Sequence, residues 1–418
     1  MLSSFFSGIS GLMANSYGIN VVGNNIANVN TIGFKGARAT FQDVLYQSVF
    51  GTAGTSQIGR GAALSSVDTL FSQGSFESTS ESTDLAIGGK GFFKVKSPDN
   101  NSMYYTRAGQ FRFDKEGNLV NPGGYLVQGR PIDRVTHTPY GVDGDIVISP
   151  EPSEPRATTF VAMACNLQQD ATAPDVLNPF DASDPTSYNY TSSVTVYDSI
   201  GQSHTLSVYF RKTAANAWTW YASAPDAASG PTPASGNLSF TAQGLLASGS
   251  GVPTNLAIEY QAGTTQTISL GFDGTLGGNA TTQYPMASTT NFQTQDGYPP
   301  GVLMNVTVSP EGVISGHYSN GQILDLYQLT LASFNNPQGL SREGGNLFAE
   351  TLESGVPYTN APGQNGLGKI NPNSLEQSNV DLATEFVKMI ISQRGFQANS
   401  RVITTTDEIL GELMNLKR

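Results

Sequence analysis

The chain has 418 residues, of which 13% are charged, and its 46 glycines favour turn-rich β structure over a helical bundle. Its formal net charge of −12 argues against nucleic acid or an anionic membrane as a partner, because both are bound by basic surfaces. Residues 157–341 hold eleven acidic and two basic residues, a net charge of −9, which we interpret as a solvated outer surface.

The first segment, residues 1–30, predicts an amphipathic helix of low charge. Its apolar side chains recur at intervals of three or four residues, with Ser16 and Gly23 in register. A stripe of this period is stable only when another helix covers it. The stripe consists of Leu2, Phe5, Ile9, Leu12, Ile19 and Ile26.

The next segment, residues 31–84, is rich in glycine and predicts an extended connector with no compact core. Within it, residues 39–50 predict a short helix, since Phe41, Val44, Leu45 and Val49 fall on one side of a helical wheel.

The long middle of the chain predicts β structure. Residues 85–150 alternate apolar and polar side chains between Gly and Asn turns, with a hairpin turn expected at Gly88–Gly91. Residues 151–290 predict a second β region, which includes a meander around the turn Asp198–Gly201. Residues 291–339 return to β character, and 324–335 are expected to pair with the first β region. Residues 340–374 predict irregular connector.

The last segment again predicts a helix, from Asn379 to the end. Asp381 lies near its start, where a carboxylate is favoured by the helix dipole. Because neither terminal stripe has a helical neighbour in sequence, the two must cover each other or cover copies on other subunits. The second stripe consists of Leu382, Phe386, Met389, Phe396, Ile403, Leu410 and Met414.

These segments suggest a mainly β, nested, multidomain chain with helical termini. Residues 1–30 and 375–418 form a coiled-coil-like inner domain for polymerisation, and 31–84 with 340–374 form the connector. Residues 85–150 with 291–339 form the first β domain, and 151–290 form an inserted outer β domain. Such a layout brings the two ends of the chain together.

No catalytic, cofactor or metal site is predicted. Cys165, the single cysteine, lies in an apolar run typical of a buried small side chain, and the three histidines lack the spacing of zinc ligands. The aromatic run Trp218–Tyr221 is compatible with sugar stacking, but alternating aromatics more often form cross-strand core pairs. No run of about 18 apolar residues suggests a membrane span, and residues 1–34 do not resemble a cleavable signal peptide.

Asparagine is concentrated at the end of the first helix, in Asn24, Asn25, Asn28 and Asn30. A helix C-cap needs fewer amides, and this excess suits hydrogen bonding between identical neighbours. The sequence Gly23–Lys35 resembles the signature of the bacterial flagellar rod and hook protein family. The resemblance continues at Asp84–Phe93, Tyr105–Phe111 and Leu375–Leu382.

This resemblance implies a non-enzymatic structural subunit of the extracellular flagellar hook, exported without a cleavable signal. It would assemble with itself into a curved tube that transmits torque as a universal joint and encloses an export channel. The implied partners are the distal rod protein, the hook cap, the hook–filament junction protein and the flagellar type III export apparatus. The alternatives are a distal rod protein of the same family, or an extracellular carbohydrate-binding or adhesin β protein. The expected self-assembly residues are the two apolar stripes with Asn24, Asn25, Asn28 and Asn30.

Overall fold

The computed structural model describes residues 2–44, 46–51, 54–133, 136–149, 151–175, 177–227, 234–261 and 264–415. Contacts divide the chain into two compact units. The main unit comprises Met1–Pro150, Asn305–His317 and Ile323–Arg418, and the inserted unit comprises Glu151–Met304 and Tyr318–Gln322. The main unit therefore contains both ends of the chain. The four-part domain division proposed from the sequence stays a prediction.

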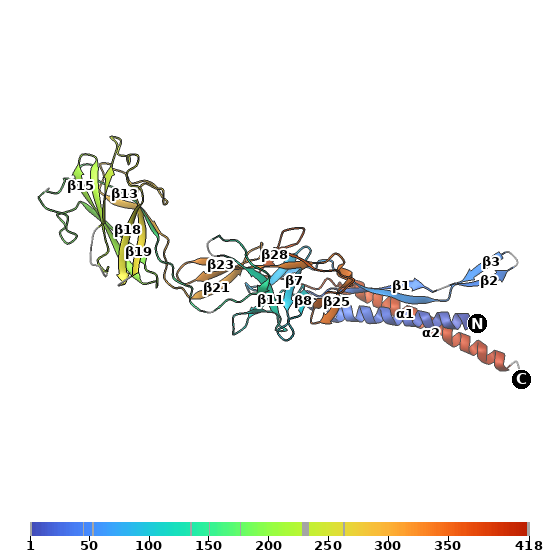
Figure 1. Cartoon of the computed structure of the whole chain (residues 1–418). Coiled ribbons are helices and arrows are strands. Elements are labelled where there is room, and N and C mark those ends of the chain that lie inside the picture. Colours follow the sequence, from blue (N-terminus) through green and yellow to red (C-terminus); the bar gives the residue numbers. More distant parts are fainter. Residues whose placement is uncertain are drawn as a thin grey trace. The chain divides into compact units, whose positions relative to one another are not determined.

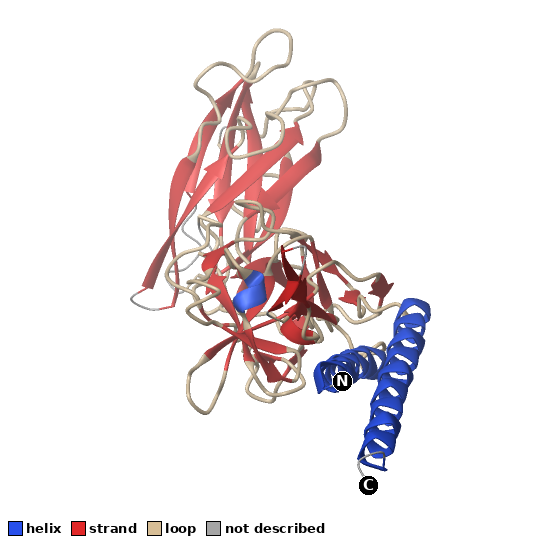
Figure 2. Cartoon of the chain, turned by 90° about the vertical axis from the view of Figure 1, so that its right-hand side faces the viewer, coloured by secondary structure: helices blue, strands red, loops and turns tan. Residues whose placement is uncertain are grey.

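Two long helices belong to the main unit, α1 (Leu2–Ala27) and α2 (Leu382–Asn415) (Figure 1). They begin and end close to the bounds expected from the sequence. Asp381 accepts hydrogen bonds from the backbone N–H groups of Ala383 and Thr384, so it caps α2 as expected. In the described part of the chain, helix otherwise occurs only in a 3-10 turn, η1 (Pro337–Gly339) (Figure 2).

A two-stranded antiparallel ribbon follows α1. Strand β1 (Ala37–Asp43) pairs with β4 (Ala62–Thr69), and β2 (Gln47–Gly51) pairs with β3 (Gly54–Ile58). The short helix predicted over residues 39–50 is therefore wrong, although Leu45 itself lies outside the described residues. The apolar spacing of this segment mimicked a helical face, whereas long-range pairing with β4 selects the strand.

The main unit contains a 13-stranded sheet with the path β21-β22-β23-β11-β7-β8-β26-β25, to which five short strands attach. As expected, residues 324–335 pair back into the first β region, since β23 pairs with β11 and β24 with β7. The bounds are β7 Phe92–Lys96, β8 Met103–Thr106, β9 Arg112–Phe113, β10 Leu119–Val120, β11 Leu126–Pro131, β12 Gly144–Asp145, β21 Leu303–Val308, β22 Val313–Tyr318, β23 Ile323–Leu329, β24 Leu331–Ser333, β25 Ser341–Gly344, β26 Leu347–Ala349 and β27 Tyr358–Asn360.

Two further strand pairs join the N-terminal and C-terminal parts of the chain. Strand β5 (Phe76–Ser78) pairs with β29 (Ser374–Glu376), and β6 (Leu85–Gly88) pairs with β28 (Lys369–Pro372). Because β6 pairs with β28 and not with β7, the hairpin turn predicted at Gly88–Gly91 is wrong. That loop instead passes from one sheet to another. The segments expected as connector thus contain β1–β5 and β25–β29.

The inserted unit consists of two four-stranded sheets, ordered β18-β19-β13-β20 and β14-β15-β16-β17. Inward side chains from both sheets form one core, which contains Cys165, Phe210, Trp218 and Trp220. The meander expected around Asp198–Gly201 is confirmed by the pairing of β14 with β15. The bounds are β13 Phe160–Asn166, β14 Tyr190–Tyr197, β15 Ser203–Ala214, β16 Ala217–Ser223, β17 Ala234–Ser239, β18 Thr254–Gln261, β19 Thr264–Gly271 and β20 Thr289–Gln295.

Candidate self-assembly surface

The two terminal helices pack side by side and antiparallel. Gly8 lies against Ile403, Gly11 against Asn399, and Gly18 against Ser392. At the far end, the amide of Asn25 donates to Glu385 Oε2 at 3.0 Å. Residue numbers therefore rise along α1 in the direction in which they fall along α2.

The seam between these helices is built from small and polar residues. A methyl group added to Gly11 would lie 2.6 Å from the amide of Asn399, and one added to Gly395 would lie 2.6 Å from Asn15. At both points a glycine of one helix contacts an asparagine side chain of the other. Because glycine has no side chain, the two backbones can approach each other closely. Pairing of the helices consequently leaves much of their apolar surface uncovered.

The predicted stripe on α2 is divided by this packing. Met389, Ile403 and Leu410 are half-buried on the side that faces α1. Leu382, Phe386 and Phe396 are 40%, 50% and 40% exposed. Within one chain, the two apolar stripes therefore do not cover each other fully.

The predicted stripe on α1 is half-buried along its length, and other apolar side chains are more exposed. The sequence pattern missed Phe6, Met13 and Tyr17, which are 56%, 59% and 48% exposed. Their spacing of seven and four residues was a signal for a second apolar face. The half-buried stripe residues are Phe5, Ile9, Leu12, Ile19 and Ile26, whereas the side chains of Leu2 and Met414 lie outside the described residues.

The asparagines at the end of α1 have different environments. Asn24 and Asn30 are exposed, and Asn28 donates to the Asn24 carbonyl at 2.9 Å. Asn25 is buried and exchanges two hydrogen bonds with the backbone of Ala37. Its amide is thus used within the chain, which does not fit the role in contacts between copies that the sequence suggested.

A cluster of buried charges fixes the loop after α1. Lys35 Nζ lies 2.6 Å from Glu376 Oε1, and Arg107 Nη1 lies 3.3 Å from Glu376 Oε2. Burial lowers the pKa of Lys35, and the hydrogen bond to Glu376 opposes this shift. Sequence reasoning included Lys35, Arg107 and Glu376 in family motifs. It did not identify their contact, because Glu376 lies 341 and 269 residues from the two cations in the chain.

Gly33 allows the same loop to pass close to the β domain. Its φ is +69°, and an added methyl group would lie 2.5 Å from the backbone nitrogen of Ala108. Its N–H donates to the carbonyl of Glu376 at 2.7 Å. The side chain of Asn379 adds two hydrogen bonds to this region. Its oxygen accepts from the Gly36 N–H at 2.8 Å, and its NH₂ group donates to the Leu70 carbonyl at 2.7 Å. The end of α1 and the start of α2 are therefore attached to the β sheets of the main unit.

No described helix is long and apolar enough to cross a lipid bilayer. Among the described residues, no three His, Cys, Asp or Glu side chains gather as metal ligands would. Trp218 and Trp220 are buried in the inserted unit, as the core interpretation of the aromatic run predicted.

Four family models match successive parts of the chain. They describe a flagellar basal body rod protein (7–35), the flagellar hook protein FlgE/F/G D1 domain (86–163), the flagellar basal body protein FlaE D2 domain (166–298) and the flagellar basal body rod FlgEFG protein C-terminal region (371–416). The flagellar hook protein FlgE of Borreliella burgdorferi is 37% identical over 448 residues and is aligned over 100% of both chains. The chain belongs to the flagellar hook protein family.

Other relatives agree with this assignment. The flagellar hook protein FlgE of Salmonella typhimurium is 37% identical over 421 residues, which cover 99% of this chain and 100% of that protein. Among solved structures, the Helicobacter pylori flagellar hook protein FlgE2 matches with a TM-score of 0.52 and 17% identity, over 72% of this chain and 100% of that one. At this identity the structural match supports the fold alone, whereas the full-length sequence matches support the family.

Proposed function

We propose that this member of the hook protein family is the structural subunit of the bacterial flagellar hook, a homopolymer that joins rod to filament. The observation that carries this proposal is the apolar surface left on both terminal helices after they have paired. Phe386 and Phe396 on α2 and Met13 on α1 are each at least 40% exposed. Exposed large apolar side chains in rows are typical of a surface that another protein covers.

The finer parts of the function belong to the same proposal. Contacts between unlike patches of identical subunits produce an open helical polymer, which suits a tube that encloses an export channel. We further propose that the tube bends and transmits torque as a universal joint, with the helices connected inside and the inserted unit outside. The proposed location is the extracellular flagellar hook. The proposed partners are the distal rod protein, the hook cap, the hook–filament junction protein and the flagellar type III export apparatus.

Two observations favour the hook over the alternatives. The chain and its hook-protein relatives align over their whole lengths, which disfavours a shorter rod protein. The buried rings of Trp218 and Trp220 offer no face to a sugar, so the aromatic run gives no support to a carbohydrate-binding protein.

The test compares two substitutions on α2. Phe396 is exposed, whereas Ile403 packs against Gly8. Phe396→Asp should leave a folded monomer that forms no tubes, because a charge would replace an apolar contact between copies. Ile403→Asp should also reduce the helical circular dichroism of the monomer. Electron microscopy of the purified proteins gives the result, and intact tubes from Phe396→Asp would contradict the proposal.

A further inference from the structure

The dipeptide Asn-Gly occurs twice in the chain, as Asn320-Gly321 and as Asn365-Gly366. The side-chain carbonyl of an asparagine can be attacked by the backbone nitrogen of the next residue, and glycine hinders this attack least because it has no side chain. Both glycines have a φ of +79°. The two dipeptides are therefore alike in sequence and in this backbone angle, and they differ in the hydrogen bonds around them.

Asn365 and Gly366 are the two central residues of a tight turn between β27 and β28. The Leu367 N–H closes the turn by donating to the Gln364 carbonyl at 2.9 Å. The φ of Asn365 is +49°, so both central residues have a positive φ, as in a type I′ turn. Asn-Gly is a preferred pair for such a turn, which gives a structural reason for its presence here.

The reacting groups of this turn are exposed and carry no hydrogen bonds within the described chain. Asn365 and Gly366 are both exposed to solvent. The side-chain amide of Asn365 has no hydrogen-bond partner among the described residues, and the Gly366 N–H donates to none of them. The closing bond of a β-turn is donated by its fourth residue, here Leu367, which leaves the N–H of the third residue unused. The fold therefore restrains neither the side chain to be attacked nor the attacking N–H through a hydrogen bond.

The other dipeptide is restrained at both groups. The NH₂ group of Asn320 donates to the Pro299 carbonyl at 2.8 Å, and its side-chain oxygen accepts from the Gln322 N–H at 3.1 Å. Gly321 is the fourth residue of its turn, and its N–H donates to the Tyr318 carbonyl at 3.0 Å. Three hydrogen bonds must therefore break before the same attack can start at Asn320.

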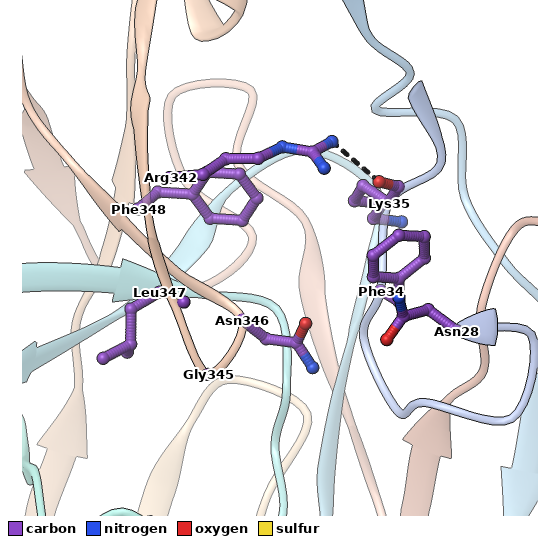
Figure 3. A pocket seen from close by; sticks show the side chains of 9 residues that line it. Asn28, Phe34, Lys35, Arg342, Gly345, Asn346, Leu347 and Phe348 are labelled. Atoms are coloured by element: carbon purple, nitrogen blue, oxygen red, sulfur yellow. Dashed lines mark hydrogen bonds between the residues drawn. The ribbon is translucent and has the colours of Figure 1, made fainter. Parts of the chain in front are cut away.

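Asn346 shows that a left-handed turn does not by itself leave an asparagine side chain unrestrained. It too has a positive φ, of +60°, in the hairpin between β25 and β26. Its side chain lies beside a cavity of about 190 Å³ and points toward the loop that carries Phe34 (Figure 3). There its NH₂ group donates to the Ile32 carbonyl at 2.8 Å. Asn346 is thus held by a hydrogen bond, whereas Asn365 is not.

We propose that Asn365 is a site of spontaneous deamidation. The backbone nitrogen of Gly366 loses its proton to water and forms a bond to the side-chain carbonyl carbon of Asn365. The side-chain nitrogen takes up a proton and leaves as ammonia, which closes a succinimide ring. Water then opens the ring at one of its two carbonyl groups and yields aspartate or isoaspartate. Water is the only co-reactant, and no group is oxidised or reduced.

The position of the turn permits this reaction and determines its consequence. A turn of exposed residues opens locally at a small cost in free energy, so the attacking nitrogen can reach the side chain without unfolding of the sheet. The product adds one negative charge to a chain whose formal net charge is −12. Isoaspartate also adds a carbon atom to the backbone between Gln364 and Leu367, which changes the turn. This inference is independent of the proposed function, because it concerns a single chain.

The test compares the two dipeptides within the same molecule. Purified full-length protein is incubated at neutral pH below its unfolding temperature, digested under mildly acidic conditions and analysed by tandem mass spectrometry. Deamidation raises the mass of a peptide by about one dalton. Asn365 should react at least about tenfold faster than Asn320, because three hydrogen bonds protect Asn320. Equal rates at the two sites in the folded protein would overturn the proposal.

Unfolded protein provides the reference for this comparison. In guanidinium chloride the hydrogen bonds of the fold are lost, and the two Asn-Gly dipeptides should react at similar rates. A reaction at Asn365 that occurs in guanidinium chloride but not in the folded protein would show that the fold protects this site, and it would overturn the proposal.

A pair of variants identifies the source of the product. Asn365→Gln should abolish the acidic shift in isoelectric focusing and should lower the isoaspartate detected by enzymatic methylation, because glutamine would have to form a larger ring and reacts much more slowly. Asn320→Gln is the matched control and should retain both signals. Isoaspartate at the wild-type level in aged Asn365→Gln protein would overturn the assignment to Asn365.

Discussion

At the scale of single residues, Glu376 holds together parts of the chain that are distant in sequence. It is fully buried and accepts from Lys35 and Arg107, and its carbonyl accepts from the Gly33 N–H. A buried carboxylate between two buried cations compensates charges that would otherwise be very costly to remove from water. Its role is therefore to fix the exit of α1 to the β domain.

The substitution Glu376→Gln should destabilise the main unit by about 3–5 kcal/mol, since it leaves two buried cations without a counter-charge. Chemical denaturation of the monomer, followed by circular dichroism, measures this loss. Glu353→Gln is the matched control, because Glu353 is exposed, and it should change stability by less than about 0.5 kcal/mol. Equal effects of the two substitutions would contradict the assigned role.

A second residue-scale prediction concerns acid. Asp143 receives hydrogen bonds from Lys94 Nζ at 3.0 Å and Arg130 Nε at 2.9 Å. Burial alone would raise its pKa, but these two cations hold the pKa below the ordinary 3.8. A depressed folded-state pKa gives stability that is present above the unfolded value and is lost as pH falls through the folded value.

Asp143→Asn should therefore lower the free energy of unfolding at pH 7 by about 1–3 kcal/mol. The difference from the wild type should shrink as the pH falls below about 4. Thermal unfolding measured from pH 7 to pH 2 gives both values. A difference that is constant over this range would show that the ionised form of Asp143 is not what stabilises the sheet.

At the scale of elements, the helix pair depends on glycine in the seam. Gly11→Leu would place a large side chain where a methyl group already lies 2.6 Å from Asn399. We expect the helices to separate locally at a cost of about 1–3 kcal/mol. Loss of helical signal at a lower temperature in circular dichroism would be the measured effect.

Gly23→Leu provides the control for this experiment. Gly23 lies in the same helix, and an added methyl group there would meet nothing within 4 Å. Leucine also favours helix over glycine by about 1 kcal/mol. Gly23→Leu should therefore leave the helix pair as stable as before or make it more stable. Equal loss in both variants would mean that the seam does not determine the pairing.

The same elements show how far the sequence can predict this structure. Helix bounds and most hairpins follow from local periodicity, so α1, α2 and the β14–β15 pair were predictable. The β1–β4 ribbon was not, because Phe41 and Val44 have a helical spacing and their strand partner lies elsewhere in the chain. The seam of Gly11 and Asn399 was not predicted for a different reason. The search for apolar periodicity selects large apolar side chains, and glycine and asparagine do not contribute to that pattern.

For the proposed self-assembly surface, sequence reasoning named the two terminal helices but only part of their exposed apolar side chains. It identified Phe386 and Phe396, which are exposed, together with Ile403, which lies in the seam within the chain. It did not identify Phe6 or Met13, which are also exposed. The helical period of a sequence predicts which side chains share one face of an isolated helix. Which face remains exposed depends on where the partner helix and the β1–β4 ribbon pack.

At the scale of the whole molecule, the inserted unit has a core of its own, which is formed by the two four-stranded sheets. We therefore expect the main unit to fold when residues 151–302 are replaced by a short Gly-Ser linker, which leaves β21 intact. The shortened protein should still form tubes, since the terminal helices and their exposed apolar side chains remain. Electron microscopy would show the tubes, and their curvature and bending stiffness should differ from those of the wild type.

The control is full-length protein assembled under the same conditions. Complete loss of assembly, with the helical circular dichroism of the main unit preserved, would show that contacts between inserted units are needed to build the polymer. The division between an assembling main unit and an outer inserted unit would then be incorrect.

The placement of Glu376 also has a consequence for the order of folding. Lys35 precedes it by 341 residues and Arg107 by 269. A polypeptide that emerges from a ribosome or a narrow conduit, amino end first, delivers both cations long before their shared counter-ion. Until that late glutamate arrives, closing the region around them would desolvate two like charges. We therefore expect the region around Lys35 and Arg107 to close only after almost the whole polypeptide has been released.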